Sequence, residues 1–321
     1  MNDCLYLVIP CYNEDAVLHE TAKRLLIKMN TMIDKNLISR NSKILFVNDG
    51  SKDKTRNIIQ ELHSQNSIFS GITLSRNKGH QNALLAGLMT AKEYADITIS
   101  LDADLQDDIE VIDKFVEEYY SGSDVVYGVR SSRKTDTFFK KTTALGFYKF
   151  MNALGVDVIY NHADYRLMSK RALEGLSQFK EVNLFLRGIV PLIGYKFSVV
   201  EYERHERFAG ESKYPFKKML AFALDGITSF SIKPIRIITS LGFFIFFVSF
   251  IALIYSLVVK FLGKTVTGWT SLTLSIWLLG GIQLLSLGII GEYIGKIYTE
   301  TKQRPRFIIA DKLIDTDKSD I

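Results

Sequence analysis

The first half of the chain alternates short apolar runs with longer amphipathic segments. Five apolar runs predict strands, at Leu5–Ile9, Ile44–Val47, Ile72–Leu74, Ile97–Leu101 and Val125–Tyr127. Between them, apolar residues recur at the spacing of one helix face. Helices are therefore expected near Asp15–Lys35, Asp53–Gln65, Gln81–Tyr94 and Ile109–Ser121. This alternation predicts an α/β fold with a mostly parallel, Rossmann-like sheet.

Polar segments follow four of the predicted strands, at Pro10–Glu14, Asn48–Asp53, Ser75–Gly79 and Asp102–Asp107. Parallel sheets of this kind bind ligands beyond the carboxyl ends of their strands, so these segments are the candidate site. Neither a GxGxxG motif nor a P-loop follows the first strand. That disfavours a dinucleotide-binding dehydrogenase and a P-loop NTPase.

The segment SLDADLQDD at residues 100–108 carries the strongest chemical signal. In extended backbone alternate residues share a face, so Asp102, Asp104 and Gln106 are expected to converge. Hard oxygen ligands suit Mg²⁺ or Mn²⁺, and such an ion usually takes its other ligands from water and substrate phosphates. A solvated acidic loop that caps the next helix remains the alternative.

The C-terminal third contains two long uncharged segments, Ile237–Val259 and Thr265–Gly291. A helix of about 23 residues is roughly 34 Å long, against a hydrocarbon core of about 30 Å, so two transmembrane helices are predicted. Residues 1–213 then form the α/β domain. Residues 214–236 are expected to form interfacial helices (or a soluble docking helix), 237–291 to hold the two spans at 237–259 and 268–291, and 292–321 to form a tail.

Charge placement favours a cytoplasmic α/β domain with both termini inside. Lys233 and Arg236 precede the first span, and basic residues follow the second, whereas the connecting loop has only Lys260 and Lys264. The N-terminus lacks the basic region of a signal peptide. A net charge of +5 without a basic motif does not suggest a nucleic-acid binder. Localisation in the cytoplasmic membrane is therefore expected.

Four segments resemble the inverting GT-A glycosyltransferases of family 2: VIPCYNE, FVNDGSKDKT, SRNKGHQNALLAG and SLDADLQDD. The segments HADYRLMS and RHERFAGESKYPF, with two late spans, narrow the resemblance to polyprenyl-phosphate glycosyltransferases such as dolichol-phosphate mannosyltransferase and the bacterial undecaprenyl-phosphate glucosyltransferases. The resemblance covers nearly the whole chain. It implies a GT-A catalytic domain that acts on a lipid at the membrane.

The resemblance also implies roles for individual residues. The nucleotide sugar would be bound by Pro10, Tyr12, Glu14, Asp49, Asp53, Asn77, Gly79, Asp102 and Ala103. Asp102, Asp104 and Gln106 match the metal motif, and the cation would offset charge on the departing diphosphate. Glu14 and Asp53 have an alternative as helix caps, and His80 has one as a surface residue.

The acceptor phosphate would need cations near the membrane. The candidates are Arg130, Arg133, Arg204, Arg207 and Lys213. Asp164 in HADYR aligns with the proposed base of the family, and Arg166 is expected to order it through an ion pair. Because a phosphate monoester is mostly ionised at neutral pH, Asp164 is expected to act mainly by positioning.

The favoured function is transfer of one hexose from a nucleotide sugar to undecaprenyl phosphate at the cytoplasmic leaflet. UDP-glucose is the favoured donor, with UDP-GlcNAc and GDP-mannose as alternatives. A processive polysaccharide synthase is disfavoured because neither Trp269 nor Trp277 closes a QxxRW segment. A non-catalytic membrane scaffold is the other alternative. Expected partners are a second copy of the chain, through the membrane helices, and a small flippase-like membrane protein.

Overall fold

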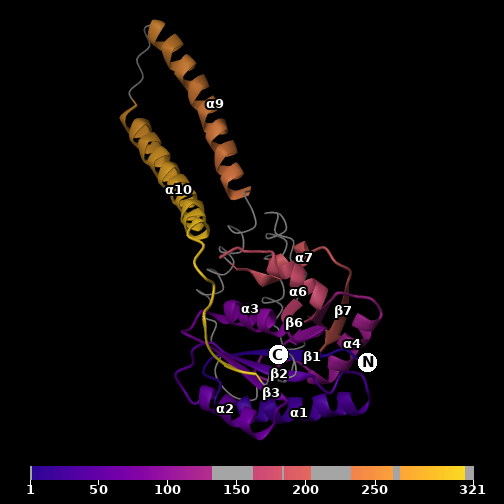
Figure 1. Cartoon of the computed structure of the whole chain (residues 1–321). Coiled ribbons are helices and arrows are strands. Elements are labelled where there is room, and N and C mark those ends of the chain that lie inside the picture. Colours follow the sequence, from indigo (N-terminus) through magenta and orange to yellow (C-terminus); the bar gives the residue numbers. More distant parts are fainter. Residues whose placement is uncertain (1, 132–161, 183, 204–232, 263–267, 315–321) are drawn as a thin grey trace. The chain divides into compact units, whose positions relative to one another are not determined.

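The computed structural model describes residues 2–131, 162–182, 184–203, 233–262 and 268–314 (Figure 1). The described residues belong to two compact units. One contains the β-sheet, its covering helices and the segment after Arg304, and the other contains helices α9 and α10. Each unit is described by itself.

An eight-stranded mixed sheet forms the centre of the first unit, in the order β7-β5-β6-β4-β1-β2-β3-β8. Its strands are β1 (Leu5–Cys11), β2 (Lys43–Asn48), β3 (Phe69–Leu74), β4 (Ile97–Ser100), β5 (Val125–Arg130), β6 (His162–Ser169), β7 (Phe197–Tyr202) and β8 (Ile309–Leu313). The five predicted strands are confirmed as β1 to β5. The pairs β1–β2, β1–β4, β2–β3 and β5–β7 are parallel.

Helices cover both faces of this sheet (Figure 1). One face carries α1 (Leu18–Asp34), α2 (Thr55–Gln65) and α4 (Ile112–Tyr120), which follows the short 3-10 helix η1 (Ile109–Val111). Apolar side chains of these helices and of the strands share one buried core. The other face carries α3 (His80–Ala91), α6 (Lys170–Ser177) and α7 (Leu186–Leu192). The four helices predicted in the first half are confirmed.

Helix α3 lies unusually close to the sheet because it presents Gly87. A Cβ atom there would lie 2.4 Å from Cγ1 of Val8 and 2.6 Å from Cγ2 of Val47. These distances are shorter than van der Waals contact, so any side chain would push α3 away from β1 and β2. The glycine thereby holds α3 close to β1 and β2.

Strand β6 runs against the direction of its neighbours, a feature that the sequence pattern does not predict. It pairs antiparallel with β4, where Ser100 lies opposite Arg166, and antiparallel with β5. A reversed strand brings its beginning, instead of its end, to the edge where β4 ends. Asp164, near the start of β6, therefore lies beside the segment that follows β4.

The segment after α10 supplies an edge strand to the sheet. Strand β8 pairs antiparallel with β3, and the backbone N–H of Ser75 donates to the carbonyl of Ile308 at 2.9 Å. Arg56 on α2 reaches Asp311 at 3.2 Å. Part of the predicted tail at 292–321 is thus a strand that covers the edge of β3.

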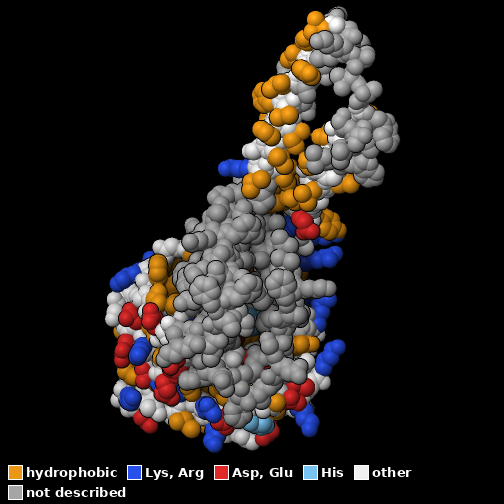
Figure 2. All heavy atoms as spheres, turned by 180° about the vertical axis from the view of Figure 1, so that it is seen from behind, with side chains coloured by type: hydrophobic (Ala, Val, Ile, Leu, Met, Phe, Trp, Pro, Cys, Tyr) orange, Lys and Arg blue, Asp and Glu red, His pale blue; other side chains and the backbone are white. Residues whose placement is uncertain are grey.

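The second unit consists of α9 (Lys233–Phe261) and α10 (Trp269–Thr301), two helices that contact each other. Large hydrophobic side chains, among them Phe243, Tyr255 and Leu284, are exposed along them (Figure 2). Within the described ranges, no helix combines the length and the apolar character that crossing a membrane requires. The two predicted spans are therefore not confirmed, and most of the predicted interfacial segment 214–236 lies outside the described residues.

Candidate active site

Hydrogen bonds tie the segments after β1 and β2 into one rim at the carboxyl edge of the sheet. The backbone N–H of Asn13 donates to Oγ of Ser51 at 3.0 Å, and the N–H of Lys52 donates to Oδ1 of Asn13 at 2.9 Å. Asn13 has a φ of +52°, a left-handed conformation that Asn tolerates. Tyr12 and Glu14 flank it and are both half-buried. Pro10 is buried inside β1.

Asp49 joins this rim to the segment after β3. Its carboxylate accepts hydrogen bonds from the backbone N–H groups of Lys78, at 2.7 Å, and Gly79, at 2.9 Å. Burial raises the pKa of Asp49 in spite of these two donors. Gly50 has a φ of +63°, and a Cβ there would lie 2.6 Å from the backbone nitrogen of Asn77. The predicted nucleotide residues Asp49, Asn77 and Gly79 are thus brought together.

Asp53 caps the start of α2, the role that the sequence allows as an alternative to nucleotide binding. Its Oδ1 accepts from the N–H of Thr55 at the start of α2, and its Oδ2 accepts from the N–H of Asp15 at 3.1 Å. Burial opposes ionisation, but these donors outweigh it and lower the pKa of Asp53. Glu14 donates its backbone N–H to Oγ1 of Thr55 at 2.9 Å. Asp53 therefore stabilises the rim of the site.

The segment Asp102–Gln106 turns sharply after β4. Leu105 has a φ of +56°, a strained conformation for a leucine. Oδ1 of Asp104 accepts from the N–H of Gln106 at 3.2 Å, and the carbonyl of Ala103 accepts from Oγ1 of Thr21 at 2.7 Å. Asp104 is buried, whereas 42% of the Asp102 side chain is exposed. The turn thus positions one buried and one partly exposed carboxylate directly after β4.

Negative charge is crowded at Asp102. Burial and the carboxylates of Asp107, Asp104 and Asp164 raise its pKa to about 6, while His80 opposes this rise. Burial is the largest of these causes, and the three neighbouring carboxylates add to it. A divalent cation would relieve this repulsion, and two carboxylates with an amide oxygen are a suitable donor set. Among the described residues, no three His, Cys, Asp or Glu side chains form a metal-binding group.

Asp164 is held by two arginines. Its Oδ1 accepts from Nη2 of Arg166 at 2.8 Å, and Arg187 donates Nε to Oδ1 at 3.2 Å and Nη2 to Oδ2 at 3.1 Å. Burial alone would raise the pKa of Asp164, but Arg187, His80 and Arg166 outweigh it and hold that pKa well below its usual range. The predicted ion pair with Arg166 is present, and Asp164 is a carboxylate with little affinity for a proton.

His80 lies between two carboxylates. From the sequence alone, a plain surface position is the alternative for this residue. Its Nε2 is 3.5 Å from Oδ2 of Asp164 and 3.7 Å from Oδ1 of Asp102. Burial disfavours the charged imidazole, but the two carboxylates outweigh it and raise the pKa of His80 to about 9. A protonated His80 at the first position of α3 therefore links the metal-motif segment to Asp164.

Arg166 is the more deeply buried of the two arginines at Asp164. Its side chain is 1% exposed, compared with 35% for Arg187. Nε and Nη1 of Arg166 have no hydrogen-bond partner among the described residues. Leaving donors unpaired in this way costs free energy, so Arg166 depends strongly on Asp164. Arg166 serves as a structural support behind the carboxylate.

The predicted acceptor cations are mostly outside the described residues. Arg133, Arg204, Arg207 and Lys213 fall there. Arg130 is described, at the end of β5. It donates Nε to the hydroxyl of Tyr202 at 3.2 Å, and its Nη2 lies 3.5 Å from Oδ1 of Asp107, which also accepts from Tyr202 at 2.6 Å. Arg130 thus stabilises the far end of the metal-motif segment.

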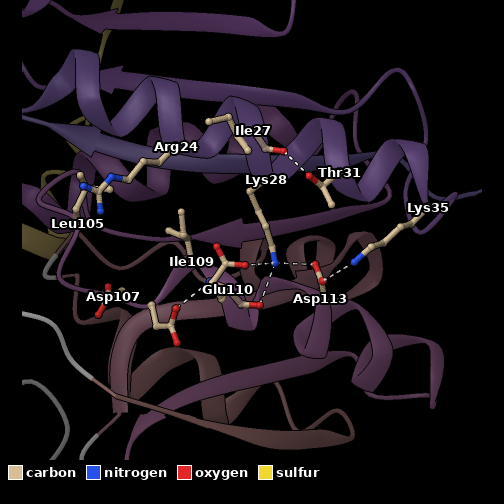
Figure 3. Close-up of a pocket in the computed structure, with 11 residues that line it drawn as sticks. Arg24, Ile27, Lys28, Thr31, Lys35, Leu105, Asp107, Ile109, Glu110 and Asp113 are labelled. Atoms are coloured by element: carbon tan, nitrogen blue, oxygen red, sulfur yellow. Dashed lines mark hydrogen bonds and ion pairs between the residues drawn. The ribbon is translucent and has the colours of Figure 1, made fainter.

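A cavity of about 590 Å³ opens on the other side of that segment, between α1 and residues 105–113 (Figure 3). Lys28 of α1 projects into it, with Nζ 3.0 Å from Oε2 of Glu110 and 3.2 Å from Oδ1 of Asp113. Neither Asp102 nor Asp164 lines the cavity. We therefore place the reaction at the carboxyl edge of the sheet and regard the Lys28 contacts as structural.

Two contacts of the site were missed by the sequence motifs. Arg187 begins an apolar helix, and its only signal is a lone cation within the run NLFLRGIVPL. Oε1 of Gln81 on α3 accepts a hydrogen bond from the backbone N–H of Leu186 at 2.9 Å. This bond fixes the start of α7 next to α3. Arg187, the next residue along the chain, contacts Asp164 from the first turn of α7.

Comparison with known families agrees with this geometry. Residues 6–177 match the model of glycosyl transferase family 2. The chain belongs to this family. Residues 233–297 match a second model, the GtrB C-terminal hairpin, which includes most of α9 and α10. The mixed α/β sheet is thus the catalytic fold of a family 2 glycosyltransferase.

The relatives of this family 2 chain span almost its full length. It is 57% identical over 305 residues to an uncharacterized glycosyltransferase, YkoT, of Bacillus subtilis (strain 168), covering 95% of this chain and 90% of the relative. It is 39% identical over 311 residues to the bactoprenol glucosyl transferase of Shigella phage SfX, covering 95% and 98%. A solved mannosyltransferase from Pyrobaculum calidifontis, in complex with GDP-Man and Mn²⁺, has a TM-score of 0.46 at 15% identity, covering 74% and 65%.

Proposed function

We propose that this protein transfers one hexose from a nucleotide sugar to a polyprenyl monophosphate, with inversion at the anomeric carbon. UDP-glucose is the favoured donor, undecaprenyl phosphate the favoured acceptor, and the cytoplasmic leaflet the place of reaction. The observation that carries the proposal is the pairing of Asp164 with Arg166 and Arg187. A carboxylate held in this way is a poor base, which suits an acceptor that is already ionised.

The relatives support the choice of acceptor. Several that are 39–40% identical to nearly the whole chain are named bactoprenol glucosyl transferases. The match to the GtrB C-terminal hairpin extends the likeness beyond the catalytic domain. Together they favour a lipid-linked phosphate over a soluble acceptor or a growing polysaccharide.

The residues of the metal motif suit a divalent cation. Asp102 and Asp104 offer two hard carboxylate oxygens, Gln106 an amide oxygen, and the crowding of carboxylates around Asp102 favours a positive charge there. Bound Mg²⁺ or Mn²⁺ would act as a Lewis acid toward the diphosphate of the donor. Thr21 would keep this segment in place through its bond to the carbonyl of Ala103.

The chemical step needs little general-base catalysis from the protein. An oxygen of the acceptor phosphate attacks the anomeric carbon, the bond from that carbon to the diphosphate oxygen breaks, and its electron pair leaves with the nucleoside diphosphate. The second pKa of a phosphate monoester is about 6, so most of the acceptor needs no proton removed at neutral pH. Asp164 then orients the arginines and the sugar.

The membrane part of the proposal rests on the uncharged segments 237–259 and 268–291 and on the exposed apolar side chains of α9 and α10. We propose that both segments cross the cytoplasmic membrane with both termini inside. Single cysteines introduced at Thr267 and Thr301 test this topology in sealed cells. An impermeant reagent should label the first and miss the second, and labelling of both would contradict it.

A panel of nucleotide sugars tests the reaction. The full chain is incubated with UDP-glucose, UDP-GlcNAc or GDP-mannose, undecaprenyl phosphate and Mn²⁺, and the lipid is analysed by mass spectrometry. Addition of a single hexose to the lipid is expected, most strongly from UDP-glucose. A polymer would indicate a processive synthase, and the absence of any product or donor hydrolysis would indicate a scaffold.

A further inference from the structure

Asp164, Arg166 and Arg187 form an asymmetric group. Both arginines contact the same carboxylate, but the Arg166 side chain is 1% exposed and the Arg187 side chain 35% exposed. Arg166 comes from β6 inside the sheet, whereas Arg187 comes from the first turn of α7. Of these two arginines, Arg187 therefore combines contact with Asp164 with access to an incoming ligand.

The contact with Asp164 orients Arg187 for a second anion. Nε and Nη2 lie against the two carboxylate oxygens, which fixes the plane of the guanidinium. A guanidinium presents its N–H donors in a rigid planar fork, and this geometry matches the oxygens of a phosphate well. Holding a long side chain in one orientation before the ligand arrives lowers the entropy cost of binding.

His80 and Asp164 link Arg187 to the metal motif. Nε2 of His80 is 3.7 Å from Asp102 and 3.5 Å from Asp164, and Asp164 in turn contacts Arg187 at 3.1 Å. In a displacement with inversion, the attacking and leaving groups lie on opposite sides of the anomeric carbon. If the leaving diphosphate lies at Asp102, the attacking group lies toward Arg187.

We propose that Arg187, oriented by Asp164, binds the phosphate monoester of the acceptor lipid. This inference rests on the proposed function and adds to it a residue and a role that the motifs do not indicate. It also gives the Asp164 carboxylate a task other than proton transfer. Asp164 is then a positioning residue, and Arg187 is the group that touches the substrate.

The test uses the full chain in detergent micelles with Mn²⁺ and three variants. Arg187→Gln removes the charge, Arg187→Lys keeps the charge but loses the fork, and Arg171→Gln is the control. Arg171 is an exposed arginine of α6 that pairs with Asp124 at 3.6 Å, outside the site. The measured quantities are KM for undecaprenyl phosphate, KM for the donor, and the affinity for UDP by calorimetry.

We expect Arg187→Gln to raise the acceptor KM by about 10–100-fold, since a charge-assisted bond to phosphate is lost. Arg187→Lys should fall between Arg187→Gln and wild type, and UDP affinity and donor KM should stay within about two-fold because the lost contact is not with the donor. Arg171→Gln should match wild type. An unchanged acceptor KM, or a parallel loss of UDP affinity, would overturn the inference.

Two controls separate this inference from other failures. The melting temperature reports whether Arg187→Gln is folded, so that a misfolded variant is not mistaken for a loss of ligand binding, and if it is misfolded the comparison uses Arg187→Lys instead. If wild type transfers no hexose to undecaprenyl phosphate, the proposed function is wrong. If wild type transfers hexose and Arg187→Gln has the same acceptor KM, only the role of Arg187 is wrong.

Discussion

Arg187 and Asp164 are joined by two parallel contacts, Nε to Oδ1 at 3.2 Å and Nη2 to Oδ2 at 3.1 Å. They come from two different elements, the start of α7 and the start of β6, and lie 23 residues apart in the sequence. A bidentate pair of this kind fixes both groups in angle as well as distance. It keeps the carboxylate ionised and the guanidinium in one plane at the edge of the sheet where the donor is proposed to bind.

The pair predicts how the rate of an Asp164→Asn variant depends on pH. The substitution keeps the size of the side chain but removes the anion that orients Arg166 and Arg187, so the transfer rate should fall about 10²-fold. Because the pKa of Asp164 is well below its usual range, the residue stays ionised throughout the working range. The pH–rate profile of the variant should therefore keep the wild-type shape. Recovery of the rate as pH rises would show that Asp164 acts as a base.

The protonation of His80 predicts a loss of stability at alkaline pH. Its folded pKa of about 9 exceeds the ordinary value of 6.5, so the stabilisation is fully present below pH 6.5 and is lost as pH rises through about 9. With a third of the side chain accessible, about 1–2 kcal/mol is expected. Thermal unfolding in EDTA across this range should show the decline, and His80→Gln should flatten it. His63→Gln on α2 is the control and should leave the decline in place.

The close approach of two loops predicts a specific sensitivity at Gly50. Alanine there meets both a left-handed φ of +63° and the backbone of Arg76 and Asn77 at 2.6–2.9 Å. Gly194 has a φ of +75° but no such neighbours, so Gly194→Ala reports the backbone strain alone, about 1–2 kcal/mol. Gly50→Ala should cost more stability than Gly194→Ala and should weaken UDP binding, which calorimetry measures. Equal effects of both variants would show that the loops can separate without harm.

The metal motif predicts dependence on a divalent cation. Asp104→Asn keeps the size of the side chain but removes an anionic ligand, so the transfer rate should fall by about 10²-fold or more while the melting temperature changes little. EDTA should abolish transfer by wild type, and added Mn²⁺ or Mg²⁺ should restore it. Asp108→Asn, at the N-cap of η1, is a suitable control because its side chain already accepts the N–H of Glu110. Full activity of Asp104→Asn in EDTA would refute a metal site here.

The periodicity of the sequence predicts β1 to β5 and the helices between them because each segment buries one face against a neighbour along the chain. It does not predict β6, whose residues Asp164 and Arg166 are polar because they form the site. Strand β8 is not predicted because its partner β3 lies more than two hundred residues earlier in the sequence. A local hydrophobic pattern does not indicate such a distant pairing. Arg187 is missed because its partner Asp164 belongs to a different element, strand β6, and the pairing depends on how α7 packs.

The sequence predicts which residues form the candidate site better than it predicts the contacts between them. The motifs identify Asp49, Asp102 and Asp164, and these lie at one edge of the sheet in the structure. They do not show that the Asp49 carboxylate binds the backbone of Lys78 and Gly79, or that His80 lies between two carboxylates. Such contacts depend on how three loops pack together, which residue types alone do not specify.

The central claim is that the acceptor is an ionised phosphate, which a site without an effective base can use. The most direct measurement compares undecaprenyl phosphate with undecaprenol as acceptors for the full chain, using UDP-glucose and Mn²⁺ at neutral pH and mass analysis of the lipid. We predict addition of one hexose to the phosphate and no detectable addition to the alcohol, whose hydroxyl would need a base. Comparable transfer to undecaprenol would contradict the account.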